Sequence, residues 1–167
     1  LISVYRYRKV CQYALDMIHW LKEKGIVMIE QPMPKEQLDD IAWITQQSPL
    51  PIFADESLQR LGDVAALKGA FTGINIKLMK CGGLYYGAQI ADIAEEAGLG
   101  CMVGCMQENK ISIVAGVSLV AAKKAIVEAD CDSFMFYKGE DDGIQGGLTR
   151  EGGIFTLLEK PGLGIEL

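Results

Sequence analysis

Residues 51–78 read PIFADESLQRLGDVAALKGAFTGINIKL, and this stretch decides the fold. An apolar run over 51–55 is followed by an amphipathic stretch over 61–69 and a second apolar run over 73–78. Short apolar runs bounded by turn residues are typical of buried strands, and the stretch between them has helical periodicity. Because parallel neighbours need a crossover connection, the segment predicts a strand–helix–strand unit of a parallel sheet.

The same unit recurs along the chain, with apolar runs at intervals of about 25 residues. The expected strands are 26–30, 51–55, 73–78, 100–106 and 132–137. The expected helices are 12–24, 35–47, 61–69, 84–97 and 110–124. Gly25 and Gly98 follow two of these helices in the manner of C-terminal caps. The pattern predicts an α/β fold with one domain over 1–167, in which 139–167 form a loop and C-terminal tail.

Composition excludes several classes of partner. The chain has 167 residues, half of them apolar, and a formal charge of −6 without clusters of Lys and Arg, which argues against nucleic acid. No apolar run approaches the roughly 20 residues that cross a bilayer, so no membrane partner is expected. Five scattered cysteines suit a reducing cytoplasm better than a disulfide framework.

Two other features receive ordinary structural interpretations. Cys101 and Cys105 form a short pair, but no second Cys or His pair accompanies them at zinc-site spacing, so packing in a strand is expected. The single histidine, His19, lies among apolar residues of a helical pattern, which favours a packing or surface role.

Polar residues stand at the carboxyl ends of the expected strands, where parallel α/β sheets bind ligands. Glu30 and Asp55 end successive strands, and such a pair suits Mg²⁺, although acids at these positions also commonly cap the following helix. Alternation places Asn75 and Lys77 on one face of the third strand. A lysine beside a metal–carboxylate cluster can have a depressed pKa and act as a base. Lys80 is expected in a loop, in a solvated or phosphate-binding role.

Four motifs carry a family resemblance: IEQP at 29–32, ADES at 54–57, NIKLMKCGG at 75–83 and MVGCMQENK at 102–110. In order and spacing they resemble the muconate-lactonizing subgroup of the enolase superfamily, and most of all its L-Ala-D/L-Glu dipeptide epimerases. The resemblance covers nearly the whole chain from about residue 13. It implies a partial TIM-type (β/α) barrel, namely the C-terminal part of an enolase-superfamily barrel.

The same resemblance implies a Mg²⁺ cofactor and a set of site residues. Glu30 and Asp55 would be metal ligands, and Lys77 would be one of two lysine acid/base groups. The remaining positions would bind substrate: Asp130, Asp132, Glu108 and Met106. Asp130 and Asp132 would hold a substrate amino group, although without the family they read as a solvated loop before a strand.

The activity implied is that of a Mg²⁺-dependent epimerase or racemase that removes the α-proton beside a carboxylate, on dipeptides such as L-Ala-L-Glu or on N-acyl amino acids. Alternatives are a non-catalytic half-barrel and a cycloisomerase or o-succinylbenzoate synthase relative. The acidic pair favours an ammonium-bearing substrate over a cycloisomer substrate, by charge complementarity.

The chain also departs from the family pattern. A full member has a capping domain and eight βα units, whereas this chain supplies roughly the last five or six, without the second strand's K-x-K. LISVYRYRK occupies the place of the third strand's D-x-N, with Ser3 and Tyr5 at about the Asp and Asn positions. A neutral serine would weaken the metal site. Exposed strand edges predict a longer chain, a homo-oligomer in which two chains complement each other, or a degenerate fragment.

Overall fold

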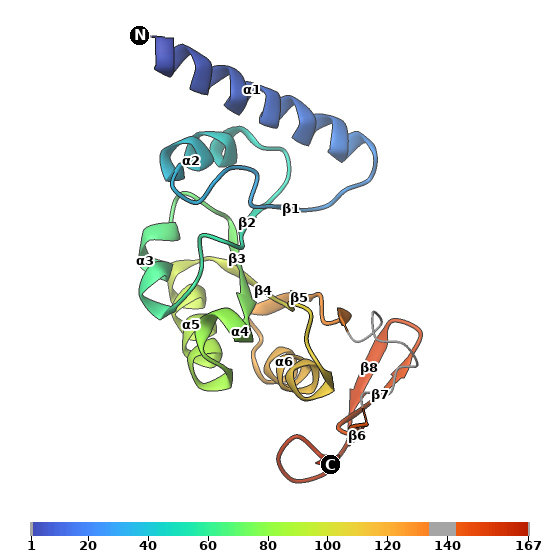
Figure 1. Cartoon of the computed structure of the whole chain (residues 1–167). Helices are drawn as coiled ribbons and strands as arrows, with labels where there is room; N and C mark the ends of the chain where they lie inside the picture. Colours follow the sequence, from blue (N-terminus) through green and yellow to red (C-terminus); the bar gives the residue numbers. More distant parts are fainter. Residues whose placement is uncertain (1, 134–142, 167) are drawn as a thin grey trace.

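The computed structural model of the chain describes residues 2–133 and 143–166, with side chains from residue 9 onward (Figure 1). Its centre is a parallel sheet in which each strand pairs with the next strand along the chain. The strands are β1 (Ile29–Glu30), β2 (Ile52–Ala54), β3 (Gly73–Lys77), β4 (Gly100–Gly104) and β5 (Ile126–Ala129). Sequential order with parallel pairing is the arrangement of a (β/α) barrel wall, which confirms the α/β class and the partial barrel.

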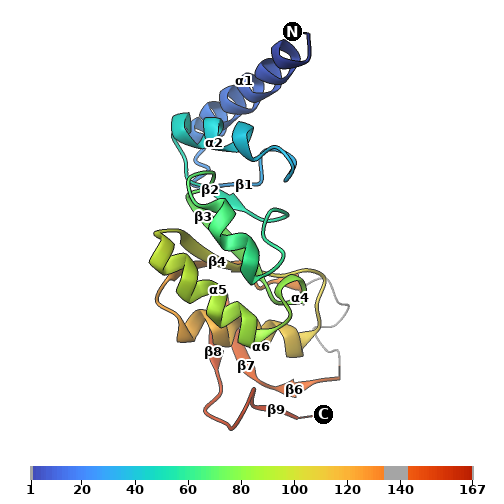
Figure 2. The same cartoon turned by 90° about the vertical axis from the view of Figure 1, so that its left-hand side faces the viewer.

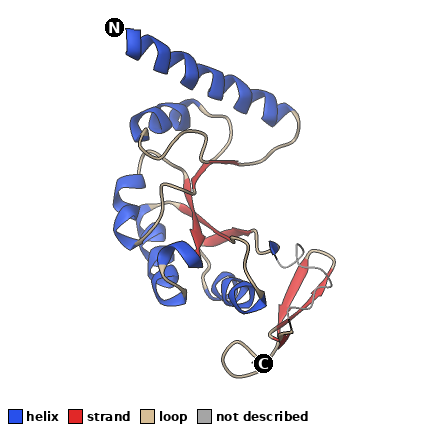
Figure 3. Ribbon diagram, viewed as in Figure 1, coloured by secondary structure: helices blue, strands red, loops and turns tan. Residues whose placement is uncertain are grey.

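Helices cover one face of this curved sheet (Figure 3). They are α2 (Leu38–Gln47), the short η1 (Leu61–Asp63) and α3 (Val64–Leu67), α5 (Leu84–Ala97) and α6 (Lys110–Ala122). Gly98 ends α5 in the left-handed conformation, and the Asn109 side chain caps the start of α6. Among the described residues, no helix has the length and apolar character needed to cross a membrane.

The main core lies between these helices and the sheet. Ile74 and Ile76 of β3 are fully buried there, together with Ile41 and Ile44 of α2 and Ile90 of α5. Burying each such side chain contributes about 1.5–3 kcal/mol. Because alternate residues of a strand face opposite sides, Asn75 and Lys77 project from the other face, as the sequence predicts.

The opposite face of the sheet is closely packed near its middle. Phe53, Asn75 and Met102 project from three neighbouring strands and are buried. A Cβ atom at Gly73 would lie 2.4 Å from the Phe53 ring, so only glycine fits beneath it. This packing fixes the positions of the strand ends that follow.

Helix α1 (Ile2–Glu23) corrects one expectation. It packs on α2 beyond the β1 edge of the sheet (Figure 2), and it begins ten residues before the predicted helix over 12–24. Ser3 and Tyr5, which stand at about the Asp and Asn positions of the family's third strand, therefore lie within a helix. The physical reason is that no glycine or proline interrupts 2–23, so the helix, once nucleated, extends through it.

The fifth strand also differs from expectation. The strand that pairs with β4 is 126–129, not 132–137, and residues 134–137 of the expected strand lie outside the described residues. The first four strands fall within their predicted ranges, although β1 is only two residues long.

The C-terminal segment forms strands where a loop and tail are expected. β7 (Leu148–Glu151) and β8 (Ile154–Leu157) pair antiparallel around Gly152 and Gly153, and β6 (Gln145–Gly146) pairs with β9 (Ile165–Glu166). Leu148, Phe155 and Leu157 pack against the main core, and β8 contacts α6. Apolar contact with α6 therefore stabilises this hairpin.

Candidate active site

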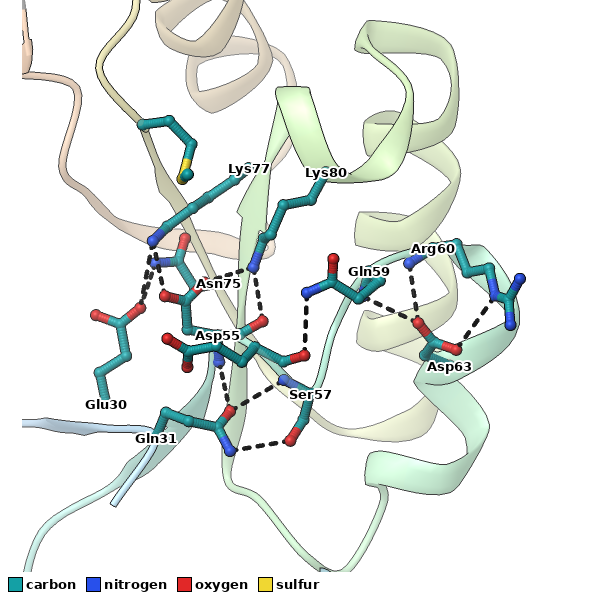
Figure 4. Close-up of polar contacts among 12 residues, drawn as sticks. Glu30, Gln31, Asp55, Ser57, Gln59, Arg60, Asp63, Asn75, Lys77 and Lys80 are labelled. Carbon is teal, nitrogen blue, oxygen red and sulfur yellow. Dashed lines mark hydrogen bonds and ion pairs between the residues drawn. The ribbon is translucent and has the colours of Figure 1, made fainter. Parts of the chain in front are cut away.

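The carboxyl ends of β1, β2 and β3 bring three charged side chains together (Figure 4). The Lys77 ammonium lies 2.8 Å from Asp55 Oδ2 and 4.0 Å from Glu30 Oε1. Asn75 donates from Nδ2 to Glu30 Oε1 at 2.7 Å. The sequence-predicted set of Glu30, Asp55 and Lys77 thus forms one cluster at the sheet edge where ligands bind in this fold.

Lys80 belongs to this cluster, contrary to the loop position expected for it. It lies on α4 (Leu78–Cys81), a single helical turn that follows β3 directly and ends at Gly82 in the left-handed conformation. Its ammonium donates to the Asp55 carbonyl oxygen at 2.6 Å and to Asp55 Oδ1, and its side chain is only 13% exposed. The paired glycines at 82 and 83 were the available signal, because glycine commonly ends a helical turn.

Gln31 is a second residue that sequence reasoning missed. Its amide oxygen accepts hydrogen bonds from the backbone N–H groups of Asp55 (3.0 Å) and Ser57 (3.1 Å), and its amide nitrogen donates to Ser57 Oγ and the Met33 carbonyl. Its φ of +39° is unusual for a residue other than glycine. Such backbone strain gathers at functional sites, and here the side chain ties the end of β1 to the loop after β2.

The electrostatics of the cluster favour the ion-paired state. Burial disfavours the charged form of Asp55, but hydrogen bonds from Lys77 and Lys80 outweigh it and hold the pKa of Asp55 below its ordinary value. Burial likewise opposes the charge on Lys77, but the hydrogen bond and charge of Asp55 raise the pKa of Lys77. The depressed lysine pKa expected from the sequence is therefore not found, because the neighbouring carboxylates stabilise the ammonium ion.

The donor chemistry of the cluster fits Mg²⁺. Glu30 and Asp55 offer carboxylate oxygens, the donors that Mg²⁺ prefers, and one or two carboxylates are its usual protein ligands. Asn75 adds a buried Oδ1 atom that has no hydrogen-bond partner within the described residues. A buried oxygen in this condition is uncommon and calls for a compensating group nearby.

A second cluster lies where β4 and β5 end. Cys105 Sγ and carboxylate oxygens of Asp130 and Asp132 all lie within 4.8 Å of one another. Burial and the nearby Asp132 charge raise the pKa of Asp130, while the positive charge of Lys77 lowers it. The charge of Lys77 therefore acts on Asp130, which lies near the first cluster.

The remaining predicted positions take different roles. Glu108 is buried, accepts a hydrogen bond from the Met106 backbone at 2.9 Å, and exchanges backbone contacts with Ser133 Oγ. This geometry favours a role in holding its own loop. Met106 is 47% exposed. His19 lies exposed on α1, and Cys101 is buried within β4, in line with their ordinary interpretations.

Comparison with known proteins agrees with this architecture. Residues 9–167 match the Enolase C-terminal domain-like family, and the chain belongs to that family. It is 60% identical over 154 residues to the L-Ala-D/L-Glu epimerase of Bacteroides thetaiotaomicron, covering 92% of this chain and 39% of that protein. The chain therefore spans about two fifths of the length of the curated relatives it matches.

Solved structures give the same result. The substrate-liganded L-Ala-D/L-Glu epimerase from Bacillus subtilis matches with a TM-score of 0.87 and 34% identity, over 93% of this chain and 44% of that one. The dipeptide epimerase from Enterococcus faecalis V583, complexed with Mg and L-Leu-L-Tyr, matches with a TM-score of 0.86 and 37% identity, over 94% of this chain and 45% of that one.

Proposed function

We propose that the chain forms the catalytic part of a Mg²⁺-dependent dipeptide epimerase that removes the α-proton beside a carboxylate. The observation that carries the proposal is the position of Lys77 Nζ, between the carboxylates of Asp55 and Glu30 at the ligand-binding edge of the sheet. Relatives that share this part of the chain are epimerases and racemases, which favours this reaction over cycloisomerisation or succinylbenzoate synthesis.

In the proposed mechanism, Glu30 and Asp55 would hold Mg²⁺, which when bound stabilises the negative charge that forms beside the substrate carboxylate. Lys77 would take the α-proton as the neutral amine, a form that is favoured once a bound cation, rather than the Lys77 ammonium, neutralises Asp55 and Glu30. Asp130 and Asp132 bind the substrate's amino group through their paired negative charge. Epimerisation would also need a proton donor on the opposite face of the substrate.

Proton NMR of the chain with Mg²⁺ and L-Ala-L-Glu in D₂O tests the proposal. The expected result is loss of the α-proton signal of the glutamate residue, abolished by Lys77→Met and unaffected by Lys68→Met, which removes an exposed lysine. Exchange together with the L,D diastereomer indicates two working bases, and exchange alone indicates Lys77 acting from one face. The absence of both exchange and epimerisation would favour a non-catalytic half-barrel.

We also propose a small-molecule substrate, a reducing cytoplasmic setting and a homo-oligomeric state. All five cysteines are free, in keeping with a reducing compartment.

Helix α1 exposes Val10, Tyr13, Met17 and Trp20 at alternating spacings of three and four residues, the pattern of a helix–helix seam. Light scattering coupled to size-exclusion chromatography checks self-association, and Tyr13→Lys with Trp20→Lys should reduce it.

A further inference from the structure

Lys77 and Lys80 donate hydrogen bonds to different oxygen atoms of Asp55 (Figure 4). Lys77 bonds to Oδ2 alone, at 2.8 Å. Lys80 bonds to Oδ1 and also to the backbone carbonyl of the same residue. An ammonium that contacts both the carbonyl and one carboxylate oxygen restricts rotation of the Asp55 side chain, because rotation would break one of the two bonds.

The helical turn that carries Lys80 is held in place by a backbone hydrogen bond and by burial of its apolar side chains. Lys80 lies on the α4 turn, whose end is fixed by a hydrogen bond from the Gly82 N–H to the Leu78 carbonyl. Leu78 and Cys81, on the same turn, are buried in the main core. The Lys80 side chain is 13% exposed, so it has little freedom to find another partner.

We infer that Lys80 is a positioning residue that holds Asp55 Oδ1 and thereby keeps Oδ2 directed toward Glu30, where a divalent cation would bind. The inference rests on the proposed function, since it assigns Asp55 as a metal ligand. In this arrangement Lys77 can be exchanged for the cation, whereas Lys80 stays bonded. Residues that orient metal ligands in this way typically change metal affinity 10–100-fold when they are mutated.

Substituting each lysine in turn separates positioning from simple charge. Each side chain places one positive charge beside Asp55, so removing either charge reduces repulsion of an incoming cation. If charge alone matters, Lys77→Met and Lys80→Met both tighten metal binding. If Lys80 positions the ligand, the two substitutions have opposite effects.

The measurement is Mn²⁺ affinity of the full 167-residue chain, from the electron paramagnetic resonance signal of the free ion. We expect Lys77→Met to tighten binding several-fold and Lys80→Met to weaken it about 10-fold or more. Lys80→Arg keeps a cation with several N–H donors and should restore most of the affinity. Lys68→Met, at an exposed position, should leave affinity unchanged.

The outcomes distinguish this inference from the proposed function. Tighter or equal binding by folded Lys80→Met would overturn the role of Lys80 while leaving the metal site intact. No Mn²⁺ binding by the unsubstituted chain, or binding unaffected by Asp55→Asn, would overturn both. Should Lys80→Met fail to fold, Lys80→Gln and Lys80→Arg carry the test: Gln, with its single neutral amide, must bind Mn²⁺ more weakly than Arg.

Discussion

Asp55 is the residue on which the candidate site depends most. Its carboxylate accepts hydrogen bonds from Lys77 and Lys80, and its backbone N–H donates a hydrogen bond to the side-chain oxygen of Gln31. Asp55→Asn removes the charge that compensates the ammonium groups of two largely buried lysine side chains and turns an amide N–H₂ toward one of them. We expect a loss of about 1–3 kcal/mol in the free energy of unfolding at pH 7, measured in urea without added metal. Asp92→Asn is the matched control, since it breaks an exposed pair with Lys123 and should cost less than about 1 kcal/mol.

The pH dependence of this difference follows from the lowered pKa of Asp55. An acid whose pKa is lower in the folded state adds stability above its unfolded pKa, near 4, and loses it as the pH falls through the folded pKa. The difference in unfolding free energy between the unsubstituted chain and Asp55→Asn should therefore shrink below about pH 4. A difference that stayed constant into acid would show that the ion pairs do not stabilise the fold.

Residue by residue, the sequence predicts those parts of the site that depend on strand alternation and strand ends. Glu30, Asp55, Asn75 and Lys77 are found where those two rules place them. Gln31 and Lys80 escape prediction for a different reason. The role of Gln31 depends on a strained backbone angle, and the role of Lys80 depends on a helical turn that begins directly after β3. Neither feature produces a periodic pattern of residues in the sequence.

At the scale of an element, the close contact between β3 and β4 at Asn75 and Gly104 leads to a testable prediction. The Asn75 amide lies directly over Gly104, where an added Cβ atom would stand 2.6 Å from its nitrogen and oxygen. Gly104→Ala must displace Asn75 and with it the hydrogen bond to Glu30. We expect a loss of about 1–3 kcal/mol of stability, together with weaker Mn²⁺ binding, measured by urea unfolding and metal titration.

Gly62→Ala is the control for that substitution, because nothing lies within 4 Å of its added Cβ. It should be neutral or stabilise by up to about 1 kcal/mol, through a smaller loss of chain entropy on folding. Equal effects of the two substitutions would mean that the close approach at Gly104 does not constrain Asn75.

Among the elements, those with a strong local signal are the ones that can be predicted. Helix α5 matches its expected range of 84–97 because glycines at 83 and 98 bound a periodic apolar face. The fifth strand and the β7–β8 hairpin are chosen by tertiary contacts instead: β5 by its pairing with β4, and the hairpin by apolar packing on α6. Local propensity is too weak to decide such segments.

At the scale of the whole molecule, the labelling rates of the buried cysteines show how readily different parts of the fold open. Burial raises the pKa of Cys101 in β4 and of Cys131 after β5 to about 12, and it also raises the pKa of Cys11 on α1. Because the thiolate is the reactive form, these thiols should react with a disulfide reagent only when their element opens. Cys105 is the half-buried exception and should react first.

The order of the slower reactions tests whether the chain unfolds as a unit. Helix α1 is held chiefly by α2, whereas β4 is paired on both edges and covered by helices, so local opening should expose Cys11 before Cys101. Mass spectrometry of timed labelling should give Cys105, then Cys11, with Cys101 and Cys131 last and together. Cys105→Ser should remove only the first step. Equal rates for Cys11 and Cys101 would contradict the prediction, because they would show that α1 separates from the molecule only when the sheet itself unfolds.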